Sequence, residues 1–244
     1  MFKAKQDAET RLADKTYSNA GNDKVVALVE QFGGGKGHCL DLGCGAGGNA
    51  ALLVRRGWVV DGITISDTEA GMARSFCRKV EVHDLEGGLP SSVGQEPYDA
   101  ILASHILEHV FYPEKLLCDC WRVLKPSGGM VISLPNLLYW KNRVKMALGS
   151  FEYQDVGIMD YTHCRWYTFR TAQALLEKHG FKILEAIADG DLLAGRSLPG
   201  FLRRRFHRVD DVIRRVAPGL VGFQMHFVAQ KPEPGATICA PGSR

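Results

Sequence analysis

The residues best suited to chemistry form a glycine-rich turn that follows an acidic side chain. Asp41 stands two positions before the first of three glycines, Gly43, Gly45 and Gly47, and Cys44 lies among them. Glycines let the backbone turn sharply and come close to a ligand, and the amides of such a loop can receive a polar or anionic group. A carboxylate can hold a cationic group beside them. The pattern therefore predicts a loop that binds a small polar ligand.

The glycine spacing alone fits more than one class of protein. Gly43, Gly45 and Gly48 can also be placed in the G-x-G-x-x-G pattern of dinucleotide-binding folds, which have their acidic residue about 20 residues later. In this chain Asp41 precedes the loop instead. On the loop alone, a nicotinamide-dependent oxidoreductase and a purely structural tight turn both stay open.

Three histidines are candidates for proton transfer. His105 and His109 follow a predicted strand, and His163 lies between Asp160 and Arg165. Imidazole titrates near neutral pH, so it suits removal of a proton from an acceptor group. His163 is the first candidate for a general base, followed by His109 and His105, and each of them can instead be structural.

Alternating strands and helices would position these residues. Helices are predicted over 22–32, 49–56, 67–76, 113–124 and 171–179, and strands over 38–42, 58–65, 80–83, 98–104, 130–134, 181–188 and 223–230. This alternation predicts an α/β fold with a mostly parallel sheet and helices on both faces, which binds ligands beyond the carboxyl ends of its strands. The Lys-Pro-Ser-Gly-Gly segment at 125–129 predicts a tight turn.

Composition narrows the class of protein. The 244 residues are 45% hydrophobic and 23% charged with a net charge of +3, which suits one globular domain and predicts no nucleic-acid partner. The polar first residues predict no secretory signal, and no apolar run is long enough to span a membrane. The seven cysteines form no C-x-x-C pair, so we expect free thiols in the cytoplasm and no metal site.

A family resemblance adds to these observations. The segment D-L-G-C-G-A-G resembles the first motif of class I S-adenosylmethionine-dependent methyltransferases, and the match continues in register over residues 25–190. The other matching segments are 59–66, 83–85, 98–101, 104–110 and 121–129. Within the class the chain is most similar to the MetW-like and UbiG-like bacterial branch. Residues 133–136 and 160–168 resemble members of that branch often found with polysaccharide genes. The resemblance implies a Rossmann-like, seven-strand sheet with an antiparallel last strand.

The resemblance also implies which residues bind S-adenosylmethionine. Asp41 would orient the loop and hold the methionine ammonium group, Asp84 and the Leu85 amide would face the adenine, and Ser104 and His105 would lie beside the methionine moiety. The cofactor-binding residues implied in this way are Asp41, Gly43, Cys44, Gly45, Gly47, Thr64, Glu69, Asp84, Leu85 and Ser104.

One position departs from the family pattern. Many members have an acidic residue at the end of the second strand that accepts both ribose hydroxyls, whereas this chain has Thr64 there. A hydroxyl is a weaker partner than a carboxylate. We expect Glu69, on the first turn of the next helix, to be the substitute, although an acidic residue is favoured at a helix N-terminus in any case. Asp61 lies three residues before Thr64, at the opposite phase of the strand.

Two inserts interrupt the alternation. Residues 135–169 are rich in aromatic and basic side chains and are expected to form a substrate cap. Residues 195–220 contain a predicted basic amphipathic helix, 201–216. This helix could contact an anionic membrane, hold a phosphorylated substrate, or dock its apolar stripe on the sheet. The remaining organisation predicted is an arm over 1–21, a methyltransferase domain over 22–231 and a flexible tail over 232–244.

The resulting prediction is a methyltransferase that transfers a methyl group to an oxygen of a small molecule, glycan or lipid-linked precursor. It would lie in the cytoplasm, with peripheral membrane contact as an option. The first alternative is a non-catalytic, MetW-like cofactor-binding protein that acts through a partner enzyme. The second is the nicotinamide-dependent oxidoreductase.

Overall fold

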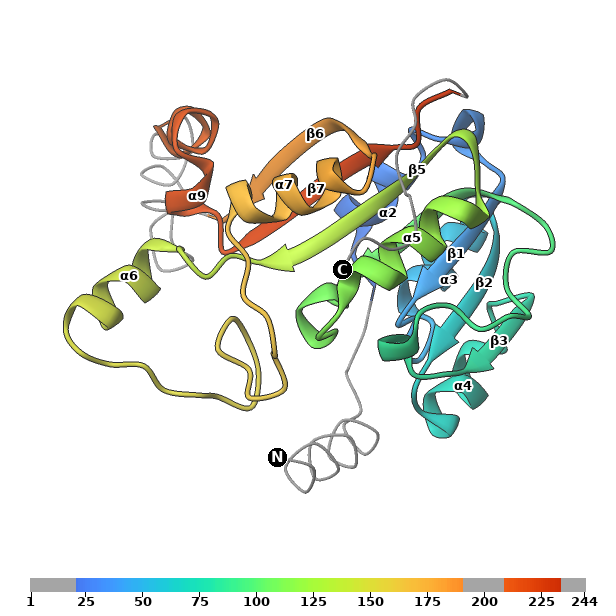
Figure 1. Cartoon of the computed structure of the whole chain (residues 1–244), viewed down its shortest axis with the longest axis horizontal. Coiled ribbons are helices and arrows are strands. Elements are labelled where there is room, and N and C mark those ends of the chain that lie inside the picture. Colours follow the sequence, from blue (N-terminus) through green and yellow to red (C-terminus); the bar gives the residue numbers. More distant parts are fainter. Residues whose placement is uncertain (1–20, 191–208, 234–244) are drawn as a thin grey trace.

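The computed structural model describes residues 21–190 and 209–233, and its centre is a seven-stranded sheet (Figure 1). The strand order is β3-β2-β1-β4-β5-β7-β6. The strands are β1 (His38–Leu42), β2 (Val59–Thr64), β3 (Lys79–Val82), β4 (Tyr98–Ser104), β5 (Leu124–Pro135), β6 (Lys182–Asp189) and β7 (Gln224–Gln230). Strands β1 to β5 run parallel, and β7 is antiparallel to both β5 and β6. The α/β, Rossmann-like prediction and the antiparallel last strand are confirmed.

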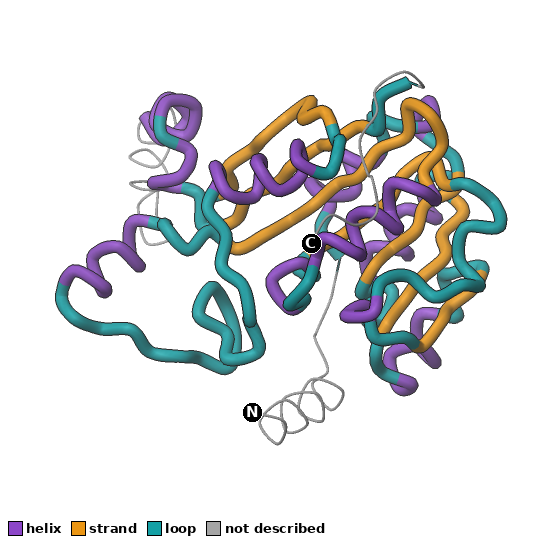
Figure 2. The backbone as a smooth tube through the Cα atoms, viewed as in Figure 1, coloured by secondary structure: helices purple, strands orange, loops and turns teal. Residues whose placement is uncertain are grey.

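Helices cover both faces of this sheet (Figure 2). They are α2 (Asp23–Val29), α3 (Gly48–Arg55), α4 (Asp67–Ala73), α5 (Pro113–Val123), α6 (Trp140–Ala147), α7 (Phe169–Lys178) and α9 (Pro218–Val221), with short 3-10 turns η1 (Gly33–Gly35), η2 (Leu85–Gly87) and η3 (Leu107–His109). Apolar side chains of α5 and α7 pack on one face of the sheet, and those of α2, α3 and α4 pack on the other. Burial of these apolar side chains holds the helices against the two faces of the sheet.

Local signals explain where several helices begin. The Asn22 side chain accepts hydrogen bonds from the first turn of α2, and Ser66 does the same for α4. Thr168 and Thr171 form a reciprocal capping box at the start of α7. That box moves the start of α7 to Phe169, two residues before the predicted Thr171.

The predicted tight turn at 125–129 is wrong in its details, because this segment lies within β5. Leu124 pairs with Tyr98 and Gly129 with Ala100, so the intervening residues of β5 bulge out of the ladder. Ser127 has a positive φ of 59° in this bulge. Gly129 leaves room for the ring of Phe32, whose Cζ would lie 2.0 Å from an added Cβ.

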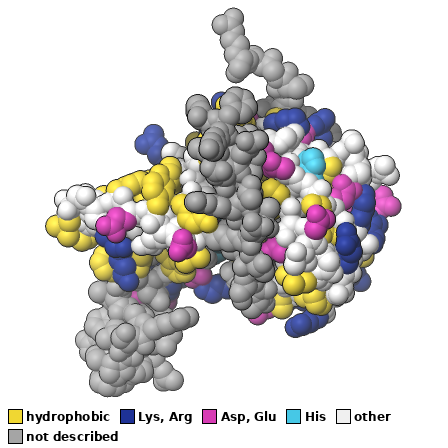
Figure 3. Space-filling model, turned by 90° about the horizontal axis from the view of Figure 1, so that it is seen from below, with side chains coloured by type: hydrophobic (Ala, Val, Ile, Leu, Met, Phe, Trp, Pro, Cys, Tyr) yellow, Lys and Arg dark blue, Asp and Glu magenta, His cyan; other side chains and the backbone are white. Residues whose placement is uncertain are grey.

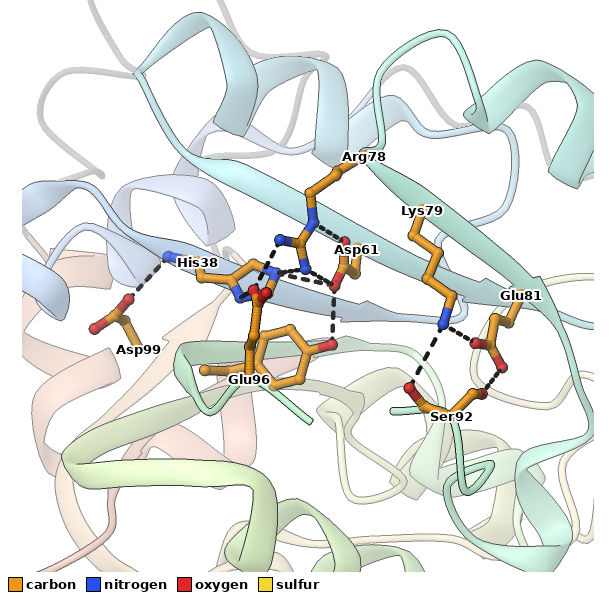
Figure 4. A network of polar contacts seen from close by, with 9 residues as sticks. His38, Asp61, Arg78, Lys79, Glu81, Ser92, Glu96 and Asp99 are labelled. Carbon is orange, nitrogen blue, oxygen red and sulfur yellow. Dashed lines mark hydrogen bonds and ion pairs between the residues drawn. The ribbon is translucent and has the colours of Figure 1, made fainter. Parts of the chain in front are cut away.

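A polar network ties together the amino ends of the strands (Figure 4). Asp61 of β2 is buried and accepts hydrogen bonds from Arg78 at 2.9 and 3.0 Å and from the Tyr98 hydroxyl at 3.0 Å. His38 Nε2 lies 2.9 Å from the same carboxylate. Burial opposes ionisation, but these partners outweigh it and hold the pKa of Asp61 well below its usual range. Asp61 is therefore a structural residue of the sheet.

The segment between β5 and α7 forms an arm that leaves the body of the molecule and returns to it (Figures 1 and 2). Its helix α6 buries none of its residues. Sequence patterns did not predict α6, because it has no apolar stripe of the kind that packs on a sheet.

Most of the predicted basic helix lies outside the described residues, as do residues 1–20 and 234–244. The described part, 209–216, is helical. Val209 and Val216 are 43% and 81% exposed, whereas Asp210 is fully buried. The prediction that the apolar stripe docks on the sheet is therefore wrong for these two valines.

Candidate functional site

A cavity of about 480 Å³ opens at the carboxyl ends of β1, β2 and β4, where the strand order reverses. Its walls come from the glycine loop, the first turn of α4, the β4–η3 turn, the start of β7 and residues 156–163 of the arm. Ten predicted site residues line it: Gly43, Gly45, Thr64, Glu69, Asp84, Leu85, Ser104, His105, His109 and His163. Asp41, Cys44 and Gly47 do not. The Cys44 side chain packs instead against Gly62 of β2.

The glycine loop closes tightly against its neighbours. A Cβ on Gly43 would lie 1.9 Å from Ile106 Cδ1, and Gly43 has a φ of 65°, so both the close approach to the β4–η3 turn and the backbone conformation favour glycine here. Behind the loop, Asp41 is 1% exposed, and its Oδ2 has no hydrogen-bond partner among the described residues. Burial raises the pKa of Asp41 to about 7. A cationic group would compensate this buried carboxylate.

Thr64 and Glu69 act as one unit at the end of β2. The Thr64 hydroxyl donates to Glu69 Oε2 at 3.0 Å, and both side chains are buried. An added Cβ on Gly45 would lie 3.7 Å from Glu69 Oε1, so the carboxylate is beside the glycine loop. Ser66 caps the Glu69 backbone amide and fixes the helix start. Asp84 lines the same cavity, and its carboxylate caps η2 by accepting the Glu86 amide at 2.9 Å.

His105 is held in a single orientation by partners on both ring nitrogens. Its backbone adopts a φ of 57°, which is unusual for a side chain with a Cβ. Gln224 Nε2 lies 3.2 Å from His105 Nε2, and an amide nitrogen only donates, so Nε2 is the acceptor. His105 Nδ1 then donates to Glu108 Oε1 at 3.1 Å. His105 therefore offers no free lone pair to an acceptor.

His109 and His163 face each other across 4.8 Å between ring centroids. His109 Nδ1 points to the Thr162 carbonyl at 3.3 Å, and His163 Nδ1 points to the Ile158 carbonyl at 3.0 Å. Burial lowers the pKa of His109, since the neighbouring carboxylate does not fully offset the loss of solvent. These contacts leave the Nε2 lone pairs of two histidines beside the cavity.

Glu108 is a functional candidate that sequence reasoning missed. It is fully buried between His105 and His109, and burial would raise its pKa, but the hydrogen bond from His105 outweighs that effect and the pKa of Glu108 is lowered. The available signal was its position in the sequence. Glu108 lies between His105 and His109, in a turn that already carries two candidate histidines. Gln224, which orients His105, had no sequence signal because it comes from a strand 119 residues away.

Comparison with known proteins identifies the type of domain. A family model described as a methyltransferase domain matches residues 9–186. Over 163 residues the chain is 31% identical to the demethylmenaquinone methyltransferase of Tropheryma whipplei, covering 59% of this chain and 65% of that protein. Over 157 residues it is 32% identical to the mitochondrial ubiquinone biosynthesis O-methyltransferase of Bos taurus, covering 59% and 41%. The chain thus spans less than two thirds of these relatives.

Solved structures agree on the fold. A SAM-dependent methyltransferase from Archaeoglobus fulgidus superposes with a TM-score of 0.60 at 20% identity, covering 86% of this chain and 94% of that one. Magnesium protoporphyrin IX methyltransferase from Synechocystis, solved with bound SAH, gives 0.53 at 17% identity, covering 86% and 80%. The cofactor that the family and fold assign is S-adenosylmethionine.

The residues present fit this cofactor. Gly43 and Gly45 line the cavity and let a ligand come close to the loop backbone, and Glu69 offers a carboxylate where hydroxyls could donate. The orphaned carboxylate of Asp41 lies behind this loop and suits an ammonium group. We therefore keep the predicted cofactor roles of these residues as proposals.

We expect S-adenosylmethionine affinity to depend on the ionisation of Asp41. Only the carboxylate can pair with the ammonium group, so the dissociation constant should rise about tenfold per pH unit below the pKa of about 7 and level off above it. Asp41→Asn should weaken binding by about 1.5–3 kcal/mol and remove this pH dependence. Calorimetric titrations between pH 6 and 8.5 measure both effects. A steep pH dependence that persists in Asp41→Asn would assign it to another group.

We expect Glu69 to take the ribose role, and Asp61 provides the matched control. Glu69→Gln should raise the S-adenosylmethionine dissociation constant about tenfold, because an amide is a weaker acceptor than a carboxylate. Asp61→Asn should leave affinity unchanged and lower the free energy of unfolding by about 1.5–3 kcal/mol, since it breaks the network with Arg78. Calorimetry and urea unfolding of both variants decide this. Equal affinities in the two variants would exclude Glu69.

Proposed function

Because the chain belongs to the methyltransferase domain family, we propose that it transfers a methyl group from S-adenosylmethionine to an oxygen of a small molecule, glycan or lipid-linked precursor. The observation that supports oxygen as the acceptor atom is the polar group formed by Glu108, His109 and His163, of which the two histidines line the arm side of the cavity. Such groups are suited to a hydroxyl, which must lose a proton to be methylated. The relatives named as ubiquinone biosynthesis O-methyltransferases support the same class of acceptor atom.

The two sides of the cavity have different roles in the proposed reaction. When bound, S-adenosylmethionine supplies a methyl group that is already activated on a sulfonium, so positioning contributes most of the rate. Asp41 and Glu69 hold the cofactor side. His109 and His163 receive the acceptor, and their Nε2 lone pairs can draw the proton from its hydroxyl. His105, locked by Gln224, positions Glu108 rather than taking a proton.

The arm supports a substrate with an apolar part. Val156 and Ile158 line the cavity on this side, and Figure 3 shows hydrophobic side chains gathered over the arm. Phe151, Tyr153 and Trp166 form an aromatic cluster with ring centroids 5.8 to 6.3 Å apart. Apolar and aromatic surface next to a polar catalytic group suits a ring or lipid-linked acceptor.

Replacing His163 tests this function. His163→Gln should lower the rate of methyl transfer about 100-fold or more, because the acceptor proton loses its receiving group, while S-adenosylmethionine affinity stays within about twofold. The assay follows transfer of a carbon-13 methyl group to panels of phenols, quinols and sugar hydroxyls by mass spectrometry. His179→Gln is the matched control, since His179 is buried at the end of α7 and does not line the cavity. Cofactor binding with no transfer to any acceptor would favour the non-catalytic, MetW-like alternative.

We also propose peripheral contact with anionic membranes through the basic segment. No helix in the described part of the chain is long and apolar enough to cross a bilayer. The support is the exposure of Val209 and Val216 on a helix that also carries the exposed Arg215, since an apolar and basic surface of this kind suits an interface. A location in the cytoplasm stays a prediction.

Vesicle sedimentation tests the membrane proposal. The protein should sediment with anionic vesicles at low salt and lose this binding at high salt, because each basic residue near the surface contributes about 1 kcal/mol that salt screens. Changing Arg203, Arg204, Arg208 and Arg215 together to Gln should abolish sedimentation. Arg214 is kept because it donates to the Gly190 carbonyl. The control changes four exposed basic residues elsewhere: Arg74, Arg170, Lys178 and Lys182. Equal losses in both variants would mean that only net charge matters.

A further inference from the structure

We infer that Glu108, His109 and His163 form a binding site for a divalent transition-metal cation. One ligand atom from each residue lies within 4.8 Å of the other two. Two of these residues lie on η3, directly after β4, and the third comes from the arm. A metal site was not expected from the sequence, because that prediction considered the cysteines, and none of them belongs to this group.

The arm is fixed at the position that completes the group. The backbone carbonyl of Glu108 accepts the amide of Cys164 at 2.9 Å and that of Arg165 at 3.1 Å. These bonds place the residue before them, His163, against η3. Backbone hydrogen bonds therefore hold the three side chains near one another.

Both histidines are oriented as metal-binding histidines usually are. A carbonyl oxygen only accepts, so the Nδ1 atoms that face Thr162 and Ile158 carry the protons, and the lone pairs are on Nε2. A hydrogen bond from the far nitrogen to a carbonyl is the common arrangement behind a ligating imidazole. The Thr162 hydroxyl, 3.2 Å from His109 Nδ1, donates to Asp160 and so reinforces that orientation.

The carboxylate of Glu108 is an independent indication of a cation. Its side chain is fully buried, and Oε2 has no hydrogen-bond partner among the described residues. Oε1 is occupied by His105 Nδ1, so Oε2 is the oxygen left to receive a cation. A buried carboxylate with one open oxygen is costly unless a positive charge lies against it.

The donor set indicates the class of metal. Two imidazoles and one carboxylate suit zinc, iron, cobalt or manganese, whereas calcium and magnesium prefer oxygen ligands alone. Three protein ligands leave coordination positions open. His109 and His163 line the cavity, so the open positions would face the space where the acceptor binds.

A role in catalysis rests on the proposed methyl transfer. With the cation bound, the Nε2 lone pairs of His109 and His163 would be ligands in place of proton acceptors. An acceptor hydroxyl bound to the cation would then have a lower pKa and release its proton to solvent. The acceptor oxygen would then form a bond to the methyl carbon as the carbon–sulfur bond breaks. The products are the methyl ether, a neutral thioether and one proton, and the oxidation state of the metal does not change.

Metal titration of the full chain tests the site. After treatment with a chelator and dialysis, the protein should bind one equivalent of Zn²⁺ by calorimetry, and Co²⁺ should give the visible absorption of a site with nitrogen and oxygen ligands. Glu108→Gln and His163→Ala should each weaken Zn²⁺ binding at least about 100-fold. His83→Ala, which removes another histidine from the same cavity, should leave it unchanged. Circular dichroism checks that each variant folds. If Glu108→Gln does not fold, His163→Ala still tests the site, because His163 lies on the arm.

The outcomes separate this site from the methyl-transfer proposal. Absence of stoichiometric binding, or binding that both variants retain, would overturn the metal site. Asp41→Asn should lose S-adenosylmethionine affinity and still bind Zn²⁺. Chelator-treated protein should transfer methyl groups at least tenfold more slowly, with recovery on adding Zn²⁺ or Co²⁺, and an unchanged rate would overturn the catalytic role. Metal binding without transfer to any acceptor would contradict the proposed function and leave the metal site intact.

Discussion

The acceptor half of the cavity depends on two hydrogen bonds that the Glu108 carbonyl receives from the arm. The amides of Cys164 and Arg165 donate them, and the Cys164 thiol adds a third contact at 3.3 Å. They join the turn after β4 to a segment more than 50 residues later. Buried Tyr167, which packs in the core, and the bond from Arg165 Nε to the Phe111 carbonyl at 2.7 Å hold the same stretch, whereas helix α6 of the arm buries no residue. The sheet fixes the position of β4, and these bonds add residues 156–163 of the arm as a wall of the cavity beside it.

The cavity has a buried carboxylate behind each of its two sides. Asp41 lies within β1, one residue before its end, and Glu108 lies on η3 just beyond β4. These two strands are neighbours in the sheet. In each carboxylate one oxygen lacks a partner among the described residues. Buried charges without partners oppose folding, so their presence at adjacent strand ends indicates that the fold keeps them for ligands. An ammonium group suits the first, and a divalent cation suits the second.

Sequence patterns predicted the parts of the molecule that local periodicity controls. The boundaries of β1 and β4, the start of a helix near Asn22 and the glycine loop follow from signals that lie within a few residues of each other. The bulge in β5 was missed because Lys-Pro-Ser-Gly-Gly has the composition of a turn, and only pairing with β4 reveals that the strand continues through it. Nine of the ten cavity residues that were found lie at or shortly after strand ends, and His163 was found by its charged neighbours Asp160 and Arg165. Glu108 and Gln224 depend on contacts across the fold, which no local pattern encodes.

The buried carboxylates of Asp41 and Glu108 imply that bound ligands stabilise the folded protein. Ionised Asp41 and Glu108 cost the empty fold free energy because water cannot reach them. Any cation that binds them only in the folded state shifts the unfolding equilibrium by mass action, by about 2.7 kcal/mol at a ligand concentration 100 times the dissociation constant. The strained backbone of His105 adds a further local cost, which its hydrogen bonds to Glu108 and Gln224 offset. Stability given up at these two buried carboxylates is therefore recovered when the site is filled.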